Sequence, residues 1–482
     1  MEKVIYITTP IFYTNGTPHL GHLHTCLLAD FFTKSFRYFS YKAFFLTGTD
    51  EHGQKISNTA KNLNLTPQAL VDKNSQIFKT FMEDFSIKYD YFIRTTQEAH
   101  KENVLKIWRI LEAKGYLYED TYRGLYAEKD ECFYSLEETE INTKGERVAI
   151  SSGNKVEEME EECYFFRLSH FKEKLMDFYN HTNFTIPHQL QKELIGFTTN
   201  LKDLCVSRKI SWGIPIPGTP STIYVWIDAL SNYLTGIGGV DNYDKTLWSN
   251  SLQIMGKDII IFHGVYWPAI LIALGIPTPK HLLVHGWWLA EQEKMSKSIG
   301  NVIDPYSIKE KDYLRYLCLK QDLIGHDGNF HKKHMINLIN NELIGKILNL
   351  IYRVFALIVK KYGLEKEIIL EDFTSREDVK ILKEKCLKQL ENFSPKNYIN
   401  TIIEYSSLCN QYIDYHTIWK DCSLLHLNYL LPLIHQITEL LEGVLVETTE
   451  KIKSLYIIKK SENKNIFTLC KLETFFTKME EE

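Results

Sequence analysis

Apolar residues in the first quarter of the chain form short runs that alternate with amphipathic stretches. Residues 4–7 and 43–46 are β-branched and aromatic, which is typical of buried strands. Thr66 and Pro67 supply a capping residue and a first-turn proline to a helical pattern that continues to Phe81. Strands that alternate with helices in this way predict a parallel sheet built from βαβ units.

The pattern changes after residue 115. Over residues 116–207, Gly, Glu and Ser interrupt short strand-like segments, and one stretch, 157–162, is nearly all acidic. The βα pattern returns over residues 208–290, where 259–262 are predicted to form a buried strand. We therefore expect one doubly wound α/β fold whose halves, 1–115 and 208–290, are separated by an insertion.

The rest of the chain has a different texture. Residues 291–335 are expected to form a polar loop followed by a linker. From 336 to 482, Leu and Ile recur at intervals of three and four residues, which predicts an all-α helical bundle as a separate domain.

Composition narrows the class of protein only a little. A chain of 482 residues with 44% hydrophobic and 24% charged residues is typical of a soluble globular protein with several domains. The nine cysteines include no CxxC pair, which favours reduced thiols in the cytoplasm. We expect neither a membrane span nor a signal peptide. The net charge of −5 does not decide whether nucleic acid is a partner, because binding needs only a local basic face.

Two short motifs carry the most chemical information. The histidine motif, His19-Leu20-Gly21-His22, follows the first predicted strand and a turn, and it opens a helix. Helix N-terminal amides and imidazole N–H groups bind anions, and a glycine lets the backbone approach a nucleotide. The lysine motif, residues 294–298, places Lys294 and Lys297 three positions apart, so that both can reach one pyrophosphate.

These motifs resemble the two signatures of class I aminoacyl-tRNA synthetases, and the surrounding sequence resembles methionyl-tRNA synthetases from end to end. The matching segments are residues 9–22, 45–56, 224–233, 256–268, 284–289 and 293–305. The resemblance implies a Rossmann-like fold split by a connective insertion, followed by an anticodon-binding helical domain. It also implies that methionine is activated by ATP with Mg²⁺ and is then transferred to the terminal adenosine of tRNA(Met).

For the nucleotide, the resemblance implies that His19, His22 and Lys297 neutralise phosphate charge, supported by Lys294. Gly21 would allow close approach of ATP, and Asp258 would hold the ribose. Arg208 would lie at the catalytic face. Adenylation needs no general base, because the substrate carboxylate is already a nucleophile.

For the amino acid, Asp50 matches the family position that receives the α-ammonium group. A carboxylate at a strand end suits this role, although a helix cap is the alternative interpretation. The apolar pocket for the thioether is expected to be formed by Ile11, Tyr13, Val225, Trp226, Ala229, Leu230, Tyr233, Phe262 and His263. Aromatic rings suit a polarizable sulfur, but any single one of them could equally be ordinary core.

Within the helical domain, Asn349 and Arg353 are four positions apart and therefore share a helical face. With Trp419 they match the positions where the family reads the anticodon, except that Ile418 replaces the usual proline. An indole can stack on an unpaired base, while Asn and Arg reach base edges. A core tryptophan and a surface ion pair are the alternative interpretation.

The insertion departs from many relatives at their zinc-binding knuckles. Residues 126–132 place Ala127 and Asp130 where a cysteine pair is expected, and Cys132 and Cys163 alone cannot complete a tetrahedral site. We therefore expect no structural zinc and no metal bound by the protein.

Three other functions were weighed against this one. A synthetase for Leu, Ile or Val needs an editing domain larger than this insertion, and the Cys enzyme needs zinc ligands. A non-catalytic tRNA-binding paralogue has no need for both motifs, and a small nucleotidylyltransferase would lack the helical domain. The absence of a further C-terminal module favours a monomer.

Overall fold

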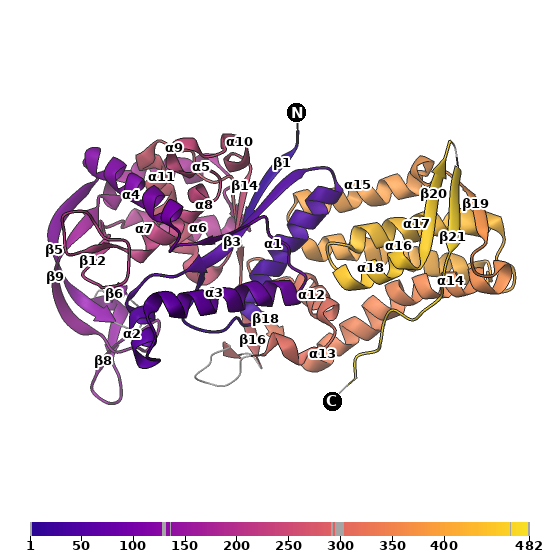
Figure 1. The fold of residues 1–482 in the computed structure, drawn as a ribbon, viewed down its shortest axis with the longest axis horizontal. Helices are drawn as coiled ribbons and strands as arrows, with labels where there is room; N and C mark the ends of the chain where they lie inside the picture. Colours follow the sequence, from indigo (N-terminus) through magenta and orange to yellow (C-terminus); the bar gives the residue numbers. More distant parts are fainter. Residues whose placement is uncertain are drawn as a thin grey trace.

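The computed structural model describes residues 2–127, 132–134, 136–290, 293–294, 303–462 and 464–480. Figure 1 shows an elongated molecule, with the sheet and the insertion at one end and the helical region at the other. In the described part of the chain, no helix is both long enough and apolar enough to cross a bilayer.

A parallel sheet forms the centre of the first region. Its hydrogen-bonded order is β10-β15-β14-β1-β3-β2, with β4 also paired to β3, and the strand pairs are all parallel. Its strands are β1 (Val4–Thr8), β2 (Phe12–Tyr13), β3 (Lys42–Asp50), β4 (Tyr91–Arg94), β10 (Thr185–Ile186), β14 (Ser251–Gly256) and β15 (His281–His285). The predicted α/β class with a parallel sheet is confirmed.

The order of the strands reverses at the middle of the sheet. From β1 the chain passes through α1 (Leu20–Tyr38) to β3 on one side, and from β14 it passes through α11 (Trp267–Leu274) to β15 on the other. Connections that leave two adjacent parallel strands in opposite directions open a crevice at their carboxyl ends. The loop after β1 and the turn after β14 therefore face one another across a ready-made binding site.

Helix α1 is buried along most of its length. One side packs on the sheet, and the other packs on the helical region through Phe31 and Phe32. Helix α12 (Lys311–Lys320) contacts both α1 and the helical region. It lies within the stretch that the sequence predicted to be a linker. Its Arg315 is fully buried and donates to Asp30 of α1 at 2.5 Å and to the Gly443 carbonyl at 3.1 Å. This buried ion pair ties the histidine-bearing helix to the helical region.

The predicted strand at residues 259–262 is wrong. Lys257–Ile259 form a 3₁₀ turn, and a helix continues from there through Phe262–Tyr266 into α11. The strand of this unit is β14, immediately upstream. A short continuous apolar run has no period that distinguishes a buried strand from a buried helix. Here the run forms helical turns that lead into α11.

The insertion contains a second, antiparallel sheet. Its long central pair is β5 (Leu117–Ala127) and β9 (Glu157–Phe166), flanked by β6 (Cys132–Tyr134) and β11 (Leu204–Cys205). The acidic run lies on β9. Helices α5 (Lys172–His181) and α6 (Gln191–Thr199) follow, with β10 between them joining the main sheet beside β15.

The helical C-terminal region is confirmed, with one difference. Its main helices are α14 (Asn349–Tyr362), α15 (Glu377–Glu391), α16 (Pro395–Tyr415), α17 (Leu424–Leu441) and α18 (Val446–Ser454). The expectation of an all-α domain missed a three-stranded antiparallel sheet of β19 (Glu367–Glu371), β21 (Lys464–Leu469) and β20 (Tyr456–Ser461). Strand β19 alternates exposed and buried residues, a period-two signal that is short beside the long helical patterns.

Candidate active site

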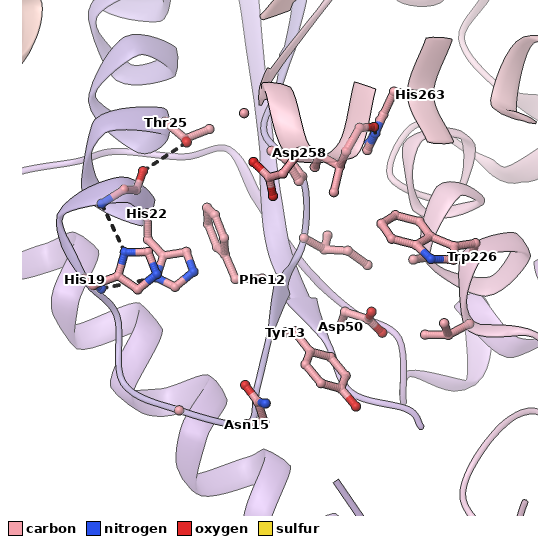
Figure 2. Close-up of a pocket in the computed structure, with 18 of the residues that line it drawn as sticks. Phe12, Tyr13, Asn15, His19, His22, Thr25, Asp50, Trp226, Asp258 and His263 are labelled. Atoms are coloured by element: carbon pink, nitrogen blue, oxygen red, sulfur yellow. Dashed lines mark hydrogen bonds between the residues drawn. The ribbon is translucent and has the colours of Figure 1, made fainter. Parts of the chain in front are cut away.

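A cavity of about 800 Å³ lies where the strand order reverses. The loop after β1, the start of α1 and the ends of β3, β14 and β15 line it, together with α7 (Val225–Leu230). Figure 2 shows the two histidines on one side and Trp226 and His263 on the other. The sequence-predicted residues that line this cavity are Ile11, Tyr13, His19, Gly21, His22, Asp50, Val225, Trp226, Ala229, Leu230, Tyr233, Asp258 and His263.

The two motif histidines cap the start of α1. The Gly21 amide donates to His19 Nδ1 at 3.1 Å, and the His19 amide donates to His22 Nδ1 at 3.2 Å. The rings stack with their centroids 3.8 Å apart. Because each Nδ1 accepts a hydrogen bond from a backbone amide, the N–H of each imidazole is on Nε2. The arrangement holds two Nε2–H donors beside a positive helix end, as an anion site requires.

Gly21 is required by the packing of this cap. A Cβ atom built on Gly21 would lie 3.0 Å from His19 Cε1 and 3.2 Å from His19 Nδ1. A side chain here would therefore require the His19 ring to shift by a few tenths of an ångström. The glycine of the motif thus serves the histidine as well as the approach of a ligand.

Asp258 stands in the turn after β14 and lies between the motif histidines and His263 in Figure 2. Its Oδ1 accepts from Trp287 Nε1 at 3.1 Å. His285 ends β15, and its Nε2 lies 2.8 Å from Thr25 Oγ1 of α1. Burial lowers the pKa of His285, which favours a neutral ring. These contacts connect the ends of β14 and β15 to the first turns of α1.

The opposite side of the cavity is aromatic and largely apolar. The Trp226 ring stacks on Phe262 with centroids 3.5 Å apart and planes 9° apart. Phe262 is not among the lining residues, so its contribution is to support Trp226 from behind. Tyr233 and His263 add a buried polar contact at this end, with Tyr233 Oη 2.7 Å from His263 Nε2.

Asp50 lies between these two sides, at the end of β3. Its carbonyl accepts from both the amide and the hydroxyl of Thr14, each at 3.1 Å. The side chain is 9% exposed and faces the cavity. Asp50 is therefore a strand-end carboxylate rather than the cap of α2 (Gln54–Asn62), whose first turn is capped at Gly53.

Arg208 lies outside the cavity lining. It is buried beneath the site, where its Nη1 donates to Cys205 Sγ at 2.9 Å and to the Ser207 carbonyl at 2.7 Å. Its guanidinium lies 5.1 Å from the centre of the Tyr224 ring, and Tyr224 does line the cavity. The structure thus places Arg208 one layer behind the pocket.

The lysine motif is only partly described. Glu293–Lys294 form strand β17, which pairs with β16 (Trp288–Ala290). Trp288, the first residue of β16, lines the cavity. The structure gives the backbone of Lys294 but not its side chain, and Lys297 lies outside the described residues. Their roles stay predictions.

Two of the three predicted anticodon residues, Arg353 and Trp419, contact one another in the helical region. Asn349 is exposed at the start of α14, and Arg353 lies one turn later. The Arg353 guanidinium lies 5.4 Å from the centre of the Trp419 ring and donates to Asp414 at 2.8 Å. Trp419 is 41% exposed, so the structure combines the ion pair with an accessible indole.

No group of three His, Cys, Asp or Glu side chains in the described residues is arranged to hold a metal ion. Cys163 is buried beside Cys205, whereas residues 128–131 and the side chain of Cys132 are not described. The absence of structural zinc stays a prediction.

Sequence reasoning missed two buried networks next to the cavity. In the first, Asp228 of α7 contacts His52 Nδ1 at 2.6 Å and His100 Nε2 at 2.8 Å. In the second, Glu51 is paired with Arg94. Both include a residue of the segment Thr49-Asp50-Glu51-His52-Gly53, so the available signal was the unusual density of ionisable residues after a buried strand.

Comparisons with known proteins show the family of the chain. The family model described as tRNA synthetases class I (M) matches residues 5–145 and 135–355. The fold and the motifs thus define a class I tRNA synthetase. The methionine–tRNA ligase of Rickettsia bellii is 40% identical over 87% of this chain and 85% of its own length. That of Rickettsia prowazekii is 41% identical over 84% of this chain and 81% of its own. The chain belongs to the methionine–tRNA ligase family.

Solved structures give the same result. The structure of Mycobacterium tuberculosis methionyl-tRNA synthetase in complex with methionyl-adenylate superposes with a TM-score of 0.85 at 32% identity. The match covers 94% of each chain. The apo form of that enzyme matches with a TM-score of 0.80 at 30% identity, over 94% of this chain and 92% of that one.

Proposed function

We propose that the cavity activates methionine with Mg²⁺-bound ATP and that the enzyme then transfers methionine to tRNA(Met). In the first step, a carboxylate oxygen of methionine attacks the α-phosphorus of ATP. The bond between the α-phosphorus and the oxygen that bridges to the β-phosphate breaks, and pyrophosphate leaves. In the second, a ribose hydroxyl of the terminal adenosine, the 2′-hydroxyl by family resemblance, attacks the activated carbonyl and releases AMP.

One observation carries this proposal. A single cavity combines a helix start with two imidazole donors, a strand-end carboxylate and an apolar aromatic pocket. The order of these features across the cavity in Figure 2 suits a ligand with a polyanion at one end, an ammonium group in the middle and an apolar side chain at the other. Methionine and ATP together have these three features.

On the phosphate side, His19 and His22 would donate from Nε2 to phosphate oxygens as negative charge develops, and Lys297 would add a positive charge. Donors that are already oriented stabilise a transition state without reorganising. Asp258 would accept from the ribose hydroxyls, and its contact with Trp287 would hold its orientation.

On the methionine side, Asp50 would bind the α-ammonium group and thereby place the carboxylate in line with the α-phosphate. Trp226, backed by Phe262, would cover the thioether. The Tyr233–His263 pair would present a fixed polar contact to the sulfur, with each sulfur–aromatic contact worth roughly 0.3–1.5 kcal/mol. Arg208 would act through Tyr224 and the pocket wall.

The anticodon would be read at Asn349, Arg353 and Trp419. A base that stacks on an accessible indole contributes roughly 1–3 kcal/mol. We also predict that the enzyme is a monomer in the cytoplasm.

The test is ATP–pyrophosphate exchange with each of the twenty amino acids in turn, without tRNA. We expect exchange with methionine alone and its loss in Lys297→Ala. Exchange that depends on a different amino acid would overturn the assignment of the pocket. No exchange with any amino acid would overturn activation at this cavity.

A further inference from the structure

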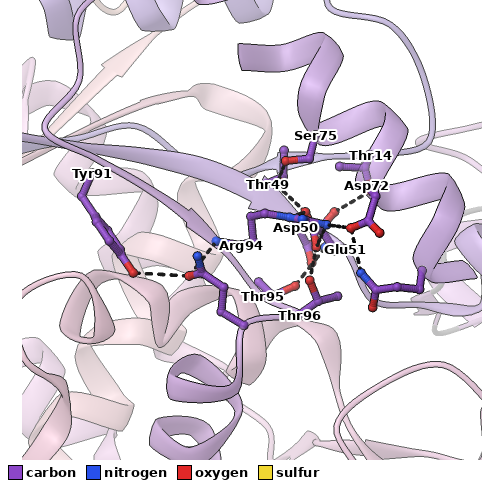
Figure 3. A network of polar contacts seen from close by, with 12 residues as sticks. Thr14, Thr49, Asp50, Glu51, Asp72, Ser75, Tyr91, Arg94, Thr95 and Thr96 are labelled. Carbon is purple, nitrogen blue, oxygen red and sulfur yellow. Dashed lines mark hydrogen bonds and ion pairs between the residues drawn. The ribbon is translucent and has the colours of Figure 1, made fainter.

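The residue after Asp50 is a completely buried carboxylate. Arg94 at the end of β4 binds both oxygens of Glu51, with Nε–Oε1 at 2.7 Å and Nη2–Oε2 at 3.0 Å. Thr49 donates to Oε1 at 2.7 Å, and Thr96 donates to Oε2. Figure 3 shows this network around the ends of β3 and β4. A buried carboxylate so fully satisfied is rigid, and its charge is compensated.

The network lies on the face of the strand opposite to the substrate. Thr49 and Glu51 are two positions apart and contact one another, so their side chains share one face. Asp50 lies between them in sequence and faces the cavity instead. The two carboxylates are therefore neighbours along the chain, with one paired to Arg94 and the other directed at the site.

The main chain around Asp50 is anchored on both sides. The Glu51 amide donates to Thr95 Oγ1 at 3.0 Å, and Trp212 Nε1 donates to the Glu51 carbonyl at 2.6 Å. Thr14, the residue after β2, donates to the Asp50 carbonyl. Movement of Glu51 would thus be transmitted directly to Asp50, because no flexible residue separates them.

The charges around Asp50 come from several elements. Arg94 pairs with Glu51 and also with Asp72 of α3 (Pro67–Asp84), at 2.5 Å. His52 is paired with Asp228 of α7. Lys55 of α2 and Tyr13 of β2 line the cavity with Asp50. Without Arg94, the Glu51 charge would be uncompensated next to Asp50 and would disfavour the ionised form of the Asp50 carboxyl.

We propose that Arg94 is a positioning residue for amino-acid activation, which neutralises Glu51 and fixes the end of β3 so that Asp50 receives the substrate ammonium group. This inference rests on the proposed function, because it assumes that Asp50 binds methionine. Arg94 touches neither substrate. Its effect belongs to methionine recognition and not to ATP binding.

The decisive experiment compares Arg94→Met with the double variant Arg94→Met/Glu51→Gln. The kcat/KM for methionine is measured in pyrophosphate exchange between pH 5 and 8. In Arg94→Met we expect the KM for methionine to rise at least about tenfold. The acid limb, where kcat/KM for methionine falls as the pH is lowered, should move to higher pH by about one unit. The KM for ATP should stay within about twofold.

The double variant separates charge from packing. It removes both charges, so we expect the acid limb to return to its wild-type position even though the strand end remains less rigid. A purely structural role predicts that the double variant is at least as impaired as the single one, with no shift of the limb in either. That result would overturn the proposal.

A milder pair of variants covers the case in which Arg94→Met does not fold. Arg94→Lys keeps the charge but loses the two-pronged contact, and we expect it to raise the KM for methionine more than that for ATP. Arg37→Lys is the matched control, because Arg37 pairs with Asp90 ahead of β4, at the opposite end of the same strand. It should leave both KM values unchanged, and equal effects of the two lysine variants would overturn the proposal.

Asp50→Asn distinguishes failure of this inference from failure of the proposed function. If Asp50→Asn loses methionine binding while the Arg94 variants retain it, the inference alone is overturned. If Asp50→Asn binds methionine normally, the proposed role of Asp50 is wrong, and the Arg94 proposal is overturned with it.

Discussion

Tyr233 Oη donates to His263 Nε2 at 2.7 Å, and His263 Nδ1 donates to the Ile259 carbonyl at 3.0 Å. The two contacts fix the tautomer of the ring, because Nδ1 carries the proton and Nε2 accepts. Burial lowers the pKa of His263 to about 4. The polar end of the methionine pocket is therefore neutral at physiological pH.

This state predicts how methionine binding depends on pH. A His with a lowered pKa is neutral above that value and becomes charged only as the pH falls through about 4. The methionine Kd, followed by quenching of tryptophan fluorescence, should therefore show no step near pH 6.5, the ordinary value for His. A step near 6.5 that disappears in His263→Asn would contradict the assignment.

Gly21→Ala should separate activity from stability. Alanine is about 0.5–1 kcal/mol more favourable than glycine in a helix interior, and this gain opposes the cost of displacing His19, so the melting temperature should change little. Its Cβ would nevertheless press on His19, and we expect kcat for exchange to drop about 10- to 100-fold.

Gly196→Ala is the matched control for Gly21→Ala. Gly196 lies inside α6, and a Cβ there meets nothing within 4 Å. It should gain about 0.5–1 kcal/mol of stability and keep full exchange activity. Equal activity of the two variants would show that the position of His19 does not matter.

Asp228→Asn should destabilise the fold. Burial raises the pKa of Asp228, but the contacts with His52 and His100 lower it by more, so that the pKa falls to about 2. The carboxylate therefore adds stability above pH 3.8 that is lost as the pH falls towards 2, worth roughly 2 kcal/mol.

Removing this charge leaves two imidazoles without their partner, and we expect a loss of about 3–5 kcal/mol at pH 7. Thermal denaturation would measure it, and the KM for methionine should rise because α7 carries Trp226. An unchanged melting temperature at pH 7 would contradict the role of the network.

Trp419→Ala should affect charging of tRNA but not exchange. Loss of one stacked base, at roughly 1–3 kcal/mol, corresponds to about a 5- to 150-fold drop in kcat/KM for tRNA. Phe197→Ala is a control of equal exposure, since both side chains are 41% exposed. If both variants charge tRNA equally well, Trp419 does not read the anticodon.

The sequence predicted those parts of the molecule whose signals are local. Strands β1 and β3 were predicted because each is an apolar run between polar turns, and α3 because Thr66 caps it and Pro67 begins it. Residues 259–262 were predicted wrongly because a short apolar run has no diagnostic period. The C-terminal strands were missed because they are brief and lie among long helices.

The same limit applies to the site. The histidine motif is visible because its members are adjacent and cap one another. The partners of Asp228 lie 176 and 128 positions away, and Arg94 and Thr96 lie 43 and 45 positions from Glu51. The local pattern shows the ionisable residues after β3, but these long-range partners come together only once the sheet has formed.

The central claim is ligation of methionine to tRNA at this cavity and its helical region. The most direct test is transfer of labelled methionine to a tRNA that reads the methionine codon, with ATP present, followed by ribonuclease digestion. We predict that the label is recovered on the terminal adenosine and that it is lost in Asp50→Asn. Label that never reaches the tRNA, with the folded enzyme and ATP present, would contradict the account.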